Sequence, residues 1–444
     1  MPSRRVLLAT AAAAAACLGV QAVPAGAATG SGEDTQVVSR GVKIPVFYNP
    51  PAELPATDGT LIRSEPLPLA LSLPTLDGPL PGTATRLMYK STDMGGGPVA
   101  VTGAYIEPAA RWGGTGPRPL VVVAPGTLGQ GDQCAASMGL EHPLSFNGRT
   151  MSLGYEDLAI YRLLAKGVAV VVTDYAGLGA TDRLHTYVNR VDEGHAVLDA
   201  ARAARSVPGA SVTAASRVGL YGYSQGGGAT AAAAELQSSY APDVRLSGTY
   251  AGAPPADLTA VTRAIDGSEL AGALGWSLNG FLQSDPALRP IADEHLNAAG
   301  KAALKDLSTM CVGDALFGYA YSKSTKWTTD GRSVSDIIGS TPALRDFLDS
   351  QRIGRLKPAG PVRLATGTSD NLVPHGQARQ LAVDWCRKGA DVTYKPVVLP
   401  SLGSALLNHV TPLLADQGSA VDWLADRLAG EAAQDNCAAL PVQP

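Results

Sequence analysis

Short, uninterrupted apolar runs recur along the chain, and stretches with helical spacing separate them. Runs of this length without polar alternation are typical of strands buried on both faces of a parallel sheet. Residues 191–205, where Ala and Leu recur at helical spacing, predict one of the intervening helices. The alternation predicts an α/β fold, with a mostly parallel sheet covered by helices on both faces. The strand-like runs are residues 120–124, 168–173, 218–221, 362–365 and 397–399.

Two segments depart from this pattern. Residues 29–84 are rich in proline and predict an extended N-terminal arm, followed by a strand pair at residues 85–90 and 99–106. Residues 254–356 are mostly helical in pattern and lie between two strands of the sheet. An insertion there would lie above the carboxyl ends of the strands, where such sheets bind ligands. We expect a helical cap or lid, with ordinary helical packing as the alternative; the core is then residues 85–253 and 357–444.

The N-terminus has the pattern of an export signal. Arg4 and Arg5 precede an alanine-rich apolar run, and small residues follow Pro24. This order predicts a signal peptide over residues 1–28, cleaved after Ala27 or Ala28. The run is too short for a transmembrane anchor. A twin-arginine signal is an alternative to ordinary export. We therefore expect a secreted, extracellular protein.

Composition narrows the function classes. The 444-residue chain is 45% hydrophobic and 17% charged, with a formal net charge of −4 and no long run of either sign. This is globular composition, and it argues against a nucleic-acid partner. Four cysteines lie beyond the signal, and an even number in an exported chain predicts two disulfides of open pairing. No pair has metal-ligand spacing, so we expect neither a metal nor a cofactor. The four are Cys134, Cys311, Cys386 and Cys437.

The sequence Gly222-Tyr223-Ser224-Gln225-Gly226 matches the G-x-S-x-G pattern of a nucleophile elbow. An apolar strand precedes it and a helix-forming stretch follows, which is the context that the motif needs. The alternative is a glycine-rich turn without chemistry. We interpret Ser224 as the nucleophile.

A serine nucleophile needs a histidine base and an acid that orients it. Chain order in this kind of fold is Ser, acid, His. His409 follows the last apolar run and precedes a long predicted helix, whereas His295 lies in the predicted cap and His375 lies before or within a helix. Asp370 comes directly after the strand at 362–365, and Asp384, inside a probable helix, is the alternative acid. We expect Asp370 and His409 to complete a triad.

An oxyanion hole needs two backbone N–H groups. The residue after the nucleophile, Gln225, supplies one. The loop after the strand at 120–124 is expected to supply the other, with Thr127 preferred over Gly126 or Leu128. A plain turn is the alternative there. The glycine-rich stretch 173–179 lacks the full phosphate-binding patterns, and we interpret it as a structural loop near the site.

Taken with these motifs, the chain resembles the secretory lipases of the Candida antarctica lipase A type and their bacterial relatives. The similarity spans nearly all of the mature chain, through residues 47–51, 59–63, 125–127, 132–135, 174–175, the Ser224 elbow, 370–374, His409 and 423–427. It implies an α/β-hydrolase core with a helical cap, no metal, and hydrolysis of acylglycerols and other carboxylic esters. It also implies disulfides Cys134–Cys311 and Cys386–Cys437.

We therefore expect a secreted serine hydrolase, a triacylglycerol lipase or esterase, that works through an acyl-enzyme on ester substrates, including those at a lipid–water interface. The same machinery suits a serine aminopeptidase or an acyltransferase. An aminopeptidase needs an acidic cluster for the substrate amine, and the cap segment holds only scattered acids such as Asp257, Asp266 and Glu269. A non-catalytic binding protein that kept the fold is the third alternative.

Overall fold

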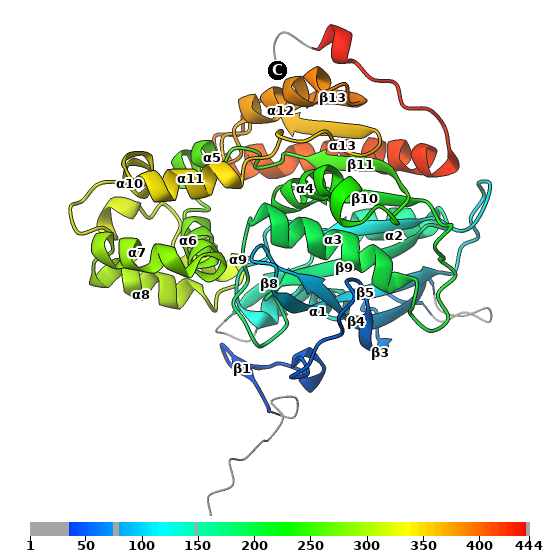
Figure 1. The fold of residues 1–444 in the computed structure, drawn as a ribbon, viewed down its shortest axis with the longest axis horizontal. Helices are drawn as coiled ribbons and strands as arrows, with labels where there is room; N and C mark the ends of the chain where they lie inside the picture. Colours follow the sequence, from blue (N-terminus) through cyan, green and yellow to red (C-terminus); the bar gives the residue numbers. More distant parts are fainter. Residues whose placement is uncertain (1–34, 74–79, 147–149, 441–444) are drawn as a thin grey trace, which may run out of the picture.

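The computed structural model describes residues 35–73, 80–146 and 150–440, and its centre is a nine-stranded sheet (Figure 1). The strands lie in the order β13-β12-β11-β10-β6-β9-β5-β4-β3. Neighbours from β13 to β9 are parallel, and those from β9 to β3 are antiparallel. The strands are β3 Leu61–Leu67, β4 Gly82–Thr92, β5 Pro98–Pro108, β6 Leu120–Ala124, β9 Ala169–Ala176, β10 Val218–Tyr223, β11 Leu246–Gly252, β12 Val362–Gly367 and β13 Val392–Val397. The predicted α/β architecture is confirmed.

Helices cover both faces of the sheet because the central strands are apolar on both sides. In β6, Val122 packs in one core cluster with α3 and α4, whereas Val121 and Val123 pack in another with α2 and α13. The covering helices are α1 Ala136–Glu141, α2 Asp157–Ala165, α3 Arg190–Ala204, α4 Gln225–Tyr240, α12 His375–Arg387 and α13 Ala405–Ala429. No helix in the described part of the chain is long and apolar enough to cross a membrane.

Seven further helices lie between β11 and β12 and form a layer at one side of the sheet (Figure 1). They enclose an apolar cluster of their own, which includes Trp276, Phe281 and Phe347. We call them the cap helices: α5 Leu258–Ile265, α6 Gly272–Ser284, α7 Arg289–His295, α8 Ala298–Leu307, α9 Val312–Gly318, α10 Val334–Ser340 and α11 Pro342–Ser350. Two small strand pairs also occur among the described residues: β1 Val38–Ser39 with β2 Val42–Lys43, and β7 Leu144–Phe146 with β8 Met151–Leu153.

Three boundaries differ from the sequence prediction. The last strand is Val392–Val397 and not 397–399, because β13 is an edge strand in which only two of six residues are buried, so it lacks a continuous apolar run. The predicted extended arm contains β3, which tolerates Pro66 because it is the opposite edge of the sheet. The final helix begins before His409, at Ala405. The predicted signal peptide, residues 1–28, lies outside the described residues.

Candidate active site

The turn between β10 and α4 holds Ser224 in a backbone conformation that few side chains adopt. Its φ is 58° and its ψ is −124°, so the residue is strained in the way that functional turns often are. Glycines make the turn possible. A Cβ on Gly222 would lie 2.1 Å from the carbonyl oxygen of Gly226, and a Cβ on Gly226 would lie 2.0 Å from that of Ala124. Ser224 therefore stands at the carboxyl end of β10, beside the loop that follows β6.

His409 connects the Ser224 hydroxyl to a buried carboxylate. Ser224 Oγ donates to His409 Nε2 over 2.8 Å, and His409 Nδ1 donates to Asp370 Oδ2 over 2.7 Å. The second bond requires the proton on Nδ1, which leaves Nε2 free to accept the hydroxyl proton. The hydroxyl of Tyr223 donates to the His409 carbonyl oxygen over 2.7 Å and holds this part of α13 beside the elbow. The structure thus brings together three side chains that are 39 to 185 residues apart.

Asp370 lies in the turn after β12, and backbone groups hold its second oxygen. Asp370 Oδ1 accepts hydrogen bonds from the N–H groups of Leu372 and Val373, both over 3.0 Å. These bonds fix the carboxylate so that Oδ2 faces His409. The alternative acid, Asp384, lies on α12, where it accepts a hydrogen bond from a glutamine side chain four residues earlier.

The other two histidines after the elbow have different surroundings. His375 begins α12, donates from Nδ1 to the carbonyl oxygen of Gly367 over 3.1 Å, and accepts at Nε2 from the Tyr394 hydroxyl over 2.6 Å. His295 is the last residue of α7 in the cap. Neither contacts Ser224 among the hydrogen bonds of the described residues.

The two residues predicted to form the oxyanion hole, Gln225 and Thr127, lie next to Ser224 in the chain or share a cavity with it. Gln225 is the first residue of α4, so its N–H has no acceptor inside the helix. Thr127 lines the same cavity as Ser224 and His409, and its side chain is held by a 2.7 Å hydrogen bond to the Tyr187 hydroxyl. Within the described residues, no backbone carbonyl accepts from either N–H. Both groups are therefore available to an oxygen that develops negative charge.

A buried polar network holds the Gln225 side chain. Its Nε2 donates to Glu193 Oε1 over 2.7 Å and to His185 Nε2 over 3.0 Å. His185 Nδ1 donates to the carbonyl oxygen of Ala176 over 2.9 Å, so the ring is neutral with Nε2 as acceptor. Burial lowers the pKa of His185 to about 4, which keeps it neutral, and burial raises the pKa of Glu193 to about 8. The network fixes the first turn of α4 behind the nucleophile.

The secretory lipase family model matches residues 140–436. The chain belongs to the secretory lipase family. The protein named "Probable inactive lipase MT1628" from Mycobacterium tuberculosis is 31% identical over 400 residues, which cover 88% of this chain and 83% of that protein. "Secreted triacylglycerol lipase LIP7" from Malassezia globosa is 29% identical over 298 residues, which cover 66% of this chain and 62% of that protein. The closed-state structure of Candida antarctica lipase A superimposes with a TM-score of 0.74 and 19% identity, covering 90% of this chain and 89% of that one.

The resemblance to the secretory lipases is thereby confirmed, and so is the α/β-hydrolase fold. Membership makes the chain an ester-hydrolysing serine hydrolase with ester substrates. This class of chemistry needs a nucleophile, a base and an oxyanion hole, and no metal takes part in it.

An apolar cavity of about 200 Å³ opens beside Ser224 in this secretory lipase. Half-buried side chains of α9 and α13 form its outer wall, including Leu316, Leu406 and Val410. A smaller space of about 30 Å³ lies on the other side of Ser224, between the cap helices and the Asp370 turn. Residues of the cap helices thus line the space around the hydroxyl, together with residues of α13.

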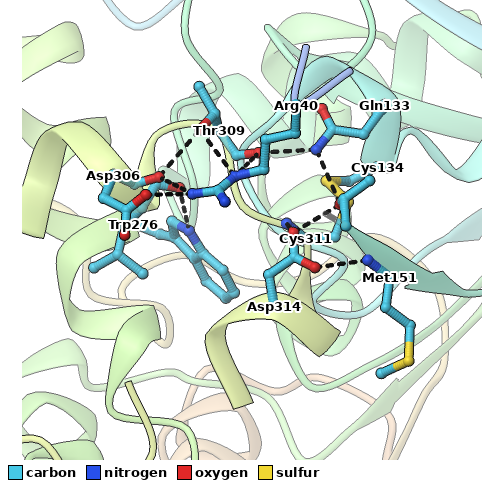
Figure 2. The surroundings of a disulfide bond; sticks show 11 residues. Arg40, Gln133, Cys134, Met151, Trp276, Asp306, Thr309, Cys311 and Asp314 are labelled. Carbon is cyan, nitrogen blue, oxygen red and sulfur yellow. Dashed lines mark hydrogen bonds and ion pairs between the residues drawn. A yellow bond between two sulfur atoms is a disulfide. The ribbon is translucent and has the colours of Figure 1, made fainter. Parts of the chain in front are cut away.

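Two disulfides are present, Cys134–Cys311 and Cys386–Cys437, with the pairing that the family resemblance implies. Figure 2 shows the first, which joins the segment beyond the loop after β6 to the start of α9. Asp314 reinforces this junction, because its carboxylate accepts from the N–H groups of Cys311 and Met151 over 2.9 and 2.6 Å.

Hydrogen bonds around this disulfide tie the cap to the core (Figure 2). Gln133 Nε2 donates to the Thr309 carbonyl oxygen over 2.8 Å, and Arg40 pairs with Asp306. The N–H of Val312 donates to the carbonyl oxygen of Leu128 over 2.7 Å. The loop after β6 and the cap helices are therefore one connected unit.

Sequence reasoning missed the buried polar residues that hold the site. Glu156, Tyr175 and Tyr187 contact the loop after β6, and Glu193 contacts Gln225. Of these four, only Tyr175 lay in a stretch predicted to lie near the site, and its contact with the loop was not foreseen. Tyr175 lies in the stretch 173–179, which was interpreted as a structural loop. Its backbone has a positive φ, which shows that this residue is conformationally constrained.

Proposed function

We propose that this protein hydrolyses acylglycerols and other carboxylic esters through Ser224, His409 and Asp370. The observation that carries the proposal is the position of His409, within 2.8 Å of the Ser224 hydroxyl and 2.7 Å of the Asp370 carboxylate. A neutral imidazole so placed can remove the serine proton while the carboxylate stabilises the imidazolium.

In the proposed mechanism, Ser224 Oγ attacks the ester carbonyl carbon while His409 Nε2 takes its proton. The carbonyl oxygen becomes an oxyanion, and the N–H groups of Gln225 and Thr127 bind it. The tetrahedral intermediate collapses when the protonated His409 gives its proton to the leaving alcohol, which leaves an acyl-enzyme. Water, deprotonated by His409, then attacks the acyl carbonyl and releases the carboxylic acid.

The surface around the cavity supports a lipid substrate. Leu407 and Leu414 on α13 and Phe317 on α9 are exposed by 46%, 60% and 83%. Each lies one residue from a side chain that lines the cavity. Residues 396–415 contain no Asp, Glu, Lys or Arg side chain. A clustered apolar rim is typical of a surface that contacts a partner or a lipid phase, so we assign it to docking at a lipid–water interface, with cap helices α5–α11 covering the acyl-binding space.

Secretion is part of the same proposal. Two disulfides are stable in oxidising compartments, and the relative from Malassezia globosa is named a secreted lipase. The signal-like N-terminus, residues 1–28, supplies the route.

The test is hydrolysis of p-nitrophenyl esters of short to long acyl chains, and of emulsified triacylglycerol, by the purified protein and by Ser224→Ala. We expect the wild type to hydrolyse both substrates and the variant to lose several orders of magnitude in kcat. Equal inactivity of both folded proteins on every ester contradicts the proposal. That result would favour a non-catalytic role, which the name of the mycobacterial relative makes a specific alternative.

A further inference from the structure

Side chains hold the peptide groups on both sides of the Thr127 N–H. In the peptide group that joins Pro125 to Gly126, the carbonyl oxygen accepts from the Tyr175 hydroxyl over 2.7 Å, and the N–H donates to Glu156 Oε1 over 2.6 Å. In the peptide group after Thr127, the carbonyl oxygen accepts from the Tyr155 hydroxyl over 3.2 Å. The Thr127 N–H lies between these two fixed planes, so its direction depends on them.

Glu156 is the only acidic side chain that contacts this loop in the described part of the chain. It precedes α2, is only 8% exposed, and lies 30 residues from its partner in sequence. A small space of about 20 Å³ beside it is lined mainly by apolar groups. No basic side chain among the described residues forms an ion pair with it. A charge in these surroundings would be uncompensated.

An ionised Glu156 would oppose the reaction that the loop serves. Since consecutive Cα atoms are 3.80 Å apart, an oxyanion on the Thr127 N–H would lie roughly 7 Å from the Glu156 carboxyl group. At an effective dielectric constant of about 20, repulsion over that distance slows the reaction roughly fifty-fold. A neutral carboxylic acid makes the same hydrogen bond to Gly126 without this repulsion.

We propose that Glu156 is a positioning residue for the oxyanion hole and that it acts as the neutral acid. It holds the peptide before Thr127 and thereby aims the Thr127 N–H at the reacting carbonyl. This inference rests on the proposed function, because it assumes that Thr127 binds the oxyanion.

Of the described groups that face Glu156, none besides Glu156 itself titrates near pH 8; Glu193, whose pKa is also raised to about 8, contacts Gln225 instead. Burial raises its pKa to about 8. Asp157, the next residue, has a pKa raised to about 6 by burial, so it is already charged at that pH and disfavours a second charge. The phenols of Tyr155, Tyr175 and Tyr221 surround it, and burial raises all three pKa values above 10.

The experiment compares Glu156→Gln, Glu156→Ala and, as a matched control, Asp157→Asn, which removes a carboxylate one residue away that makes no hydrogen bond to the loop. Each purified variant is first checked for wild-type thermal unfolding. Then kcat and KM are measured on a soluble p-nitrophenyl ester between pH 6 and pH 10.

We expect the wild type to lose kcat with a midpoint near pH 8, as Glu156 ionises. Glu156→Gln, which keeps a neutral acceptor for Gly126, should have kcat within about threefold of wild type at pH 7 and should lack this alkaline loss. Glu156→Ala should lose roughly 10- to 100-fold in kcat at every pH, with KM nearly unchanged, because only the oxyanion donor is misaligned. Asp157→Asn should keep the wild-type kcat at pH 7 and should still show the alkaline loss, with a midpoint moved to slightly lower pH because the neighbouring charge is gone.

Two results overturn the inference while leaving the proposed function intact: an alkaline loss of the same size in Glu156→Gln, or wild-type kcat in Glu156→Ala. A Glu156→Gln variant that folds but is as slow as Glu156→Ala also overturns it, because the charge and not the acceptor would then matter. Failure of the proposed function looks different. If the proposed function is wrong, the wild type is as inactive as Ser224→Ala on every ester. The inference about Glu156 is then wrong as well.

Discussion

Replacing Asp370 by asparagine exchanges one carboxylate oxygen of the proposed triad for an NH₂ group and leaves the shape of the side chain intact. In the wild type, Oδ1 accepts from two backbone N–H groups, those of Leu372 and Val373, while Oδ2 accepts from His409. An asparagine amide has one acceptor and one donor end. The two backbone donors can be satisfied only by its oxygen, so the NH₂ group must face His409 Nδ1.

That orientation forces the wrong tautomer on the base. A donor facing Nδ1 requires an unprotonated Nδ1, so the proton moves to Nε2, where it faces the Ser224 hydroxyl. His409 then cannot accept the serine proton. In serine hydrolases with this arrangement the change lowers kcat by about 10⁴, which corresponds to about 5 kcal/mol in the activation free energy. We expect a loss of that size in kcat for Asp370→Asn, with KM within about threefold.

The assay is steady-state hydrolysis of a soluble p-nitrophenyl ester, with Asp384→Asn as the control. Asp384 lies on α12 outside the triad, so its variant should keep wild-type kinetics. If Asp370→Asn stays within tenfold of wild type, Asp370 is not the acid. If Asp384→Asn shows the larger loss, the acid has been assigned to the wrong residue.

Three further outcomes follow from the structure. The double variant Cys134→Ser/Cys311→Ser opens a link across 177 residues and should lower the free energy of unfolding by about 2–5 kcal/mol; an unchanged denaturant midpoint contradicts this. Glu193 has a pKa raised from an ordinary value near 4.5 to about 8, so its contribution to stability is full below pH 4.5 and is lost as pH rises through 8. Glu193→Gln should therefore gain stability relative to wild type as pH rises from 5 to 8 in urea titrations, and a constant difference refutes this. Leu414→Ser removes an exposed apolar side chain of the rim. It should lower the rate of hydrolysis of emulsified triacylglycerol by roughly fivefold or more, while the rate on a soluble short ester stays within about twofold of wild type. Equal losses on both substrates would place Leu414 outside the lipid-docking surface.

The sequence predicted the buried central strands and the strained turn at Ser224 best. Continuous apolar runs predicted β6, β9, β10 and β12, because strands covered on both faces have no solvent side to show as polar alternation. The elbow was recognisable because the Ser224 turn admits almost only glycine at Gly222 and Gly226. A turn that requires glycine at fixed positions can therefore be recognised from a short stretch of sequence.

Edges and helix starts were less predictable. β13 is half-exposed and contains Pro396, so its pattern is weak, and the apolar residues Val398 and Leu399 beyond it were assigned to the strand instead. α13 begins at Ala405 because the Ser404 side chain accepts from the Leu407 N–H over 3.2 Å. The prediction placed the helix start after His409 and overlooked this serine cap.

The residues that hold the oxyanion loop have no sequence signal. Glu156 reaches Gly126 across 30 residues, and Tyr175 reaches Pro125 across 50. A glutamate before a short helix is ordinarily interpreted as a solvent-exposed charged residue. The contact between Glu156 and Gly126 arises because the start of α2 lies beside the loop after β6. That proximity can be seen only in the three-dimensional structure.

The central claim is that Ser224 is an activated nucleophile, and covalent labelling tests it most directly. The purified protein is treated with a fluorophosphonate, and the modified peptide is identified by mass spectrometry, beside Ser224→Ala and His409→Ala. The account predicts stoichiometric labelling at Ser224 in the wild type, none in Ser224→Ala, and labelling slowed by several orders of magnitude in His409→Ala. A folded wild type that stays unlabelled, or that is labelled at another serine, would contradict it.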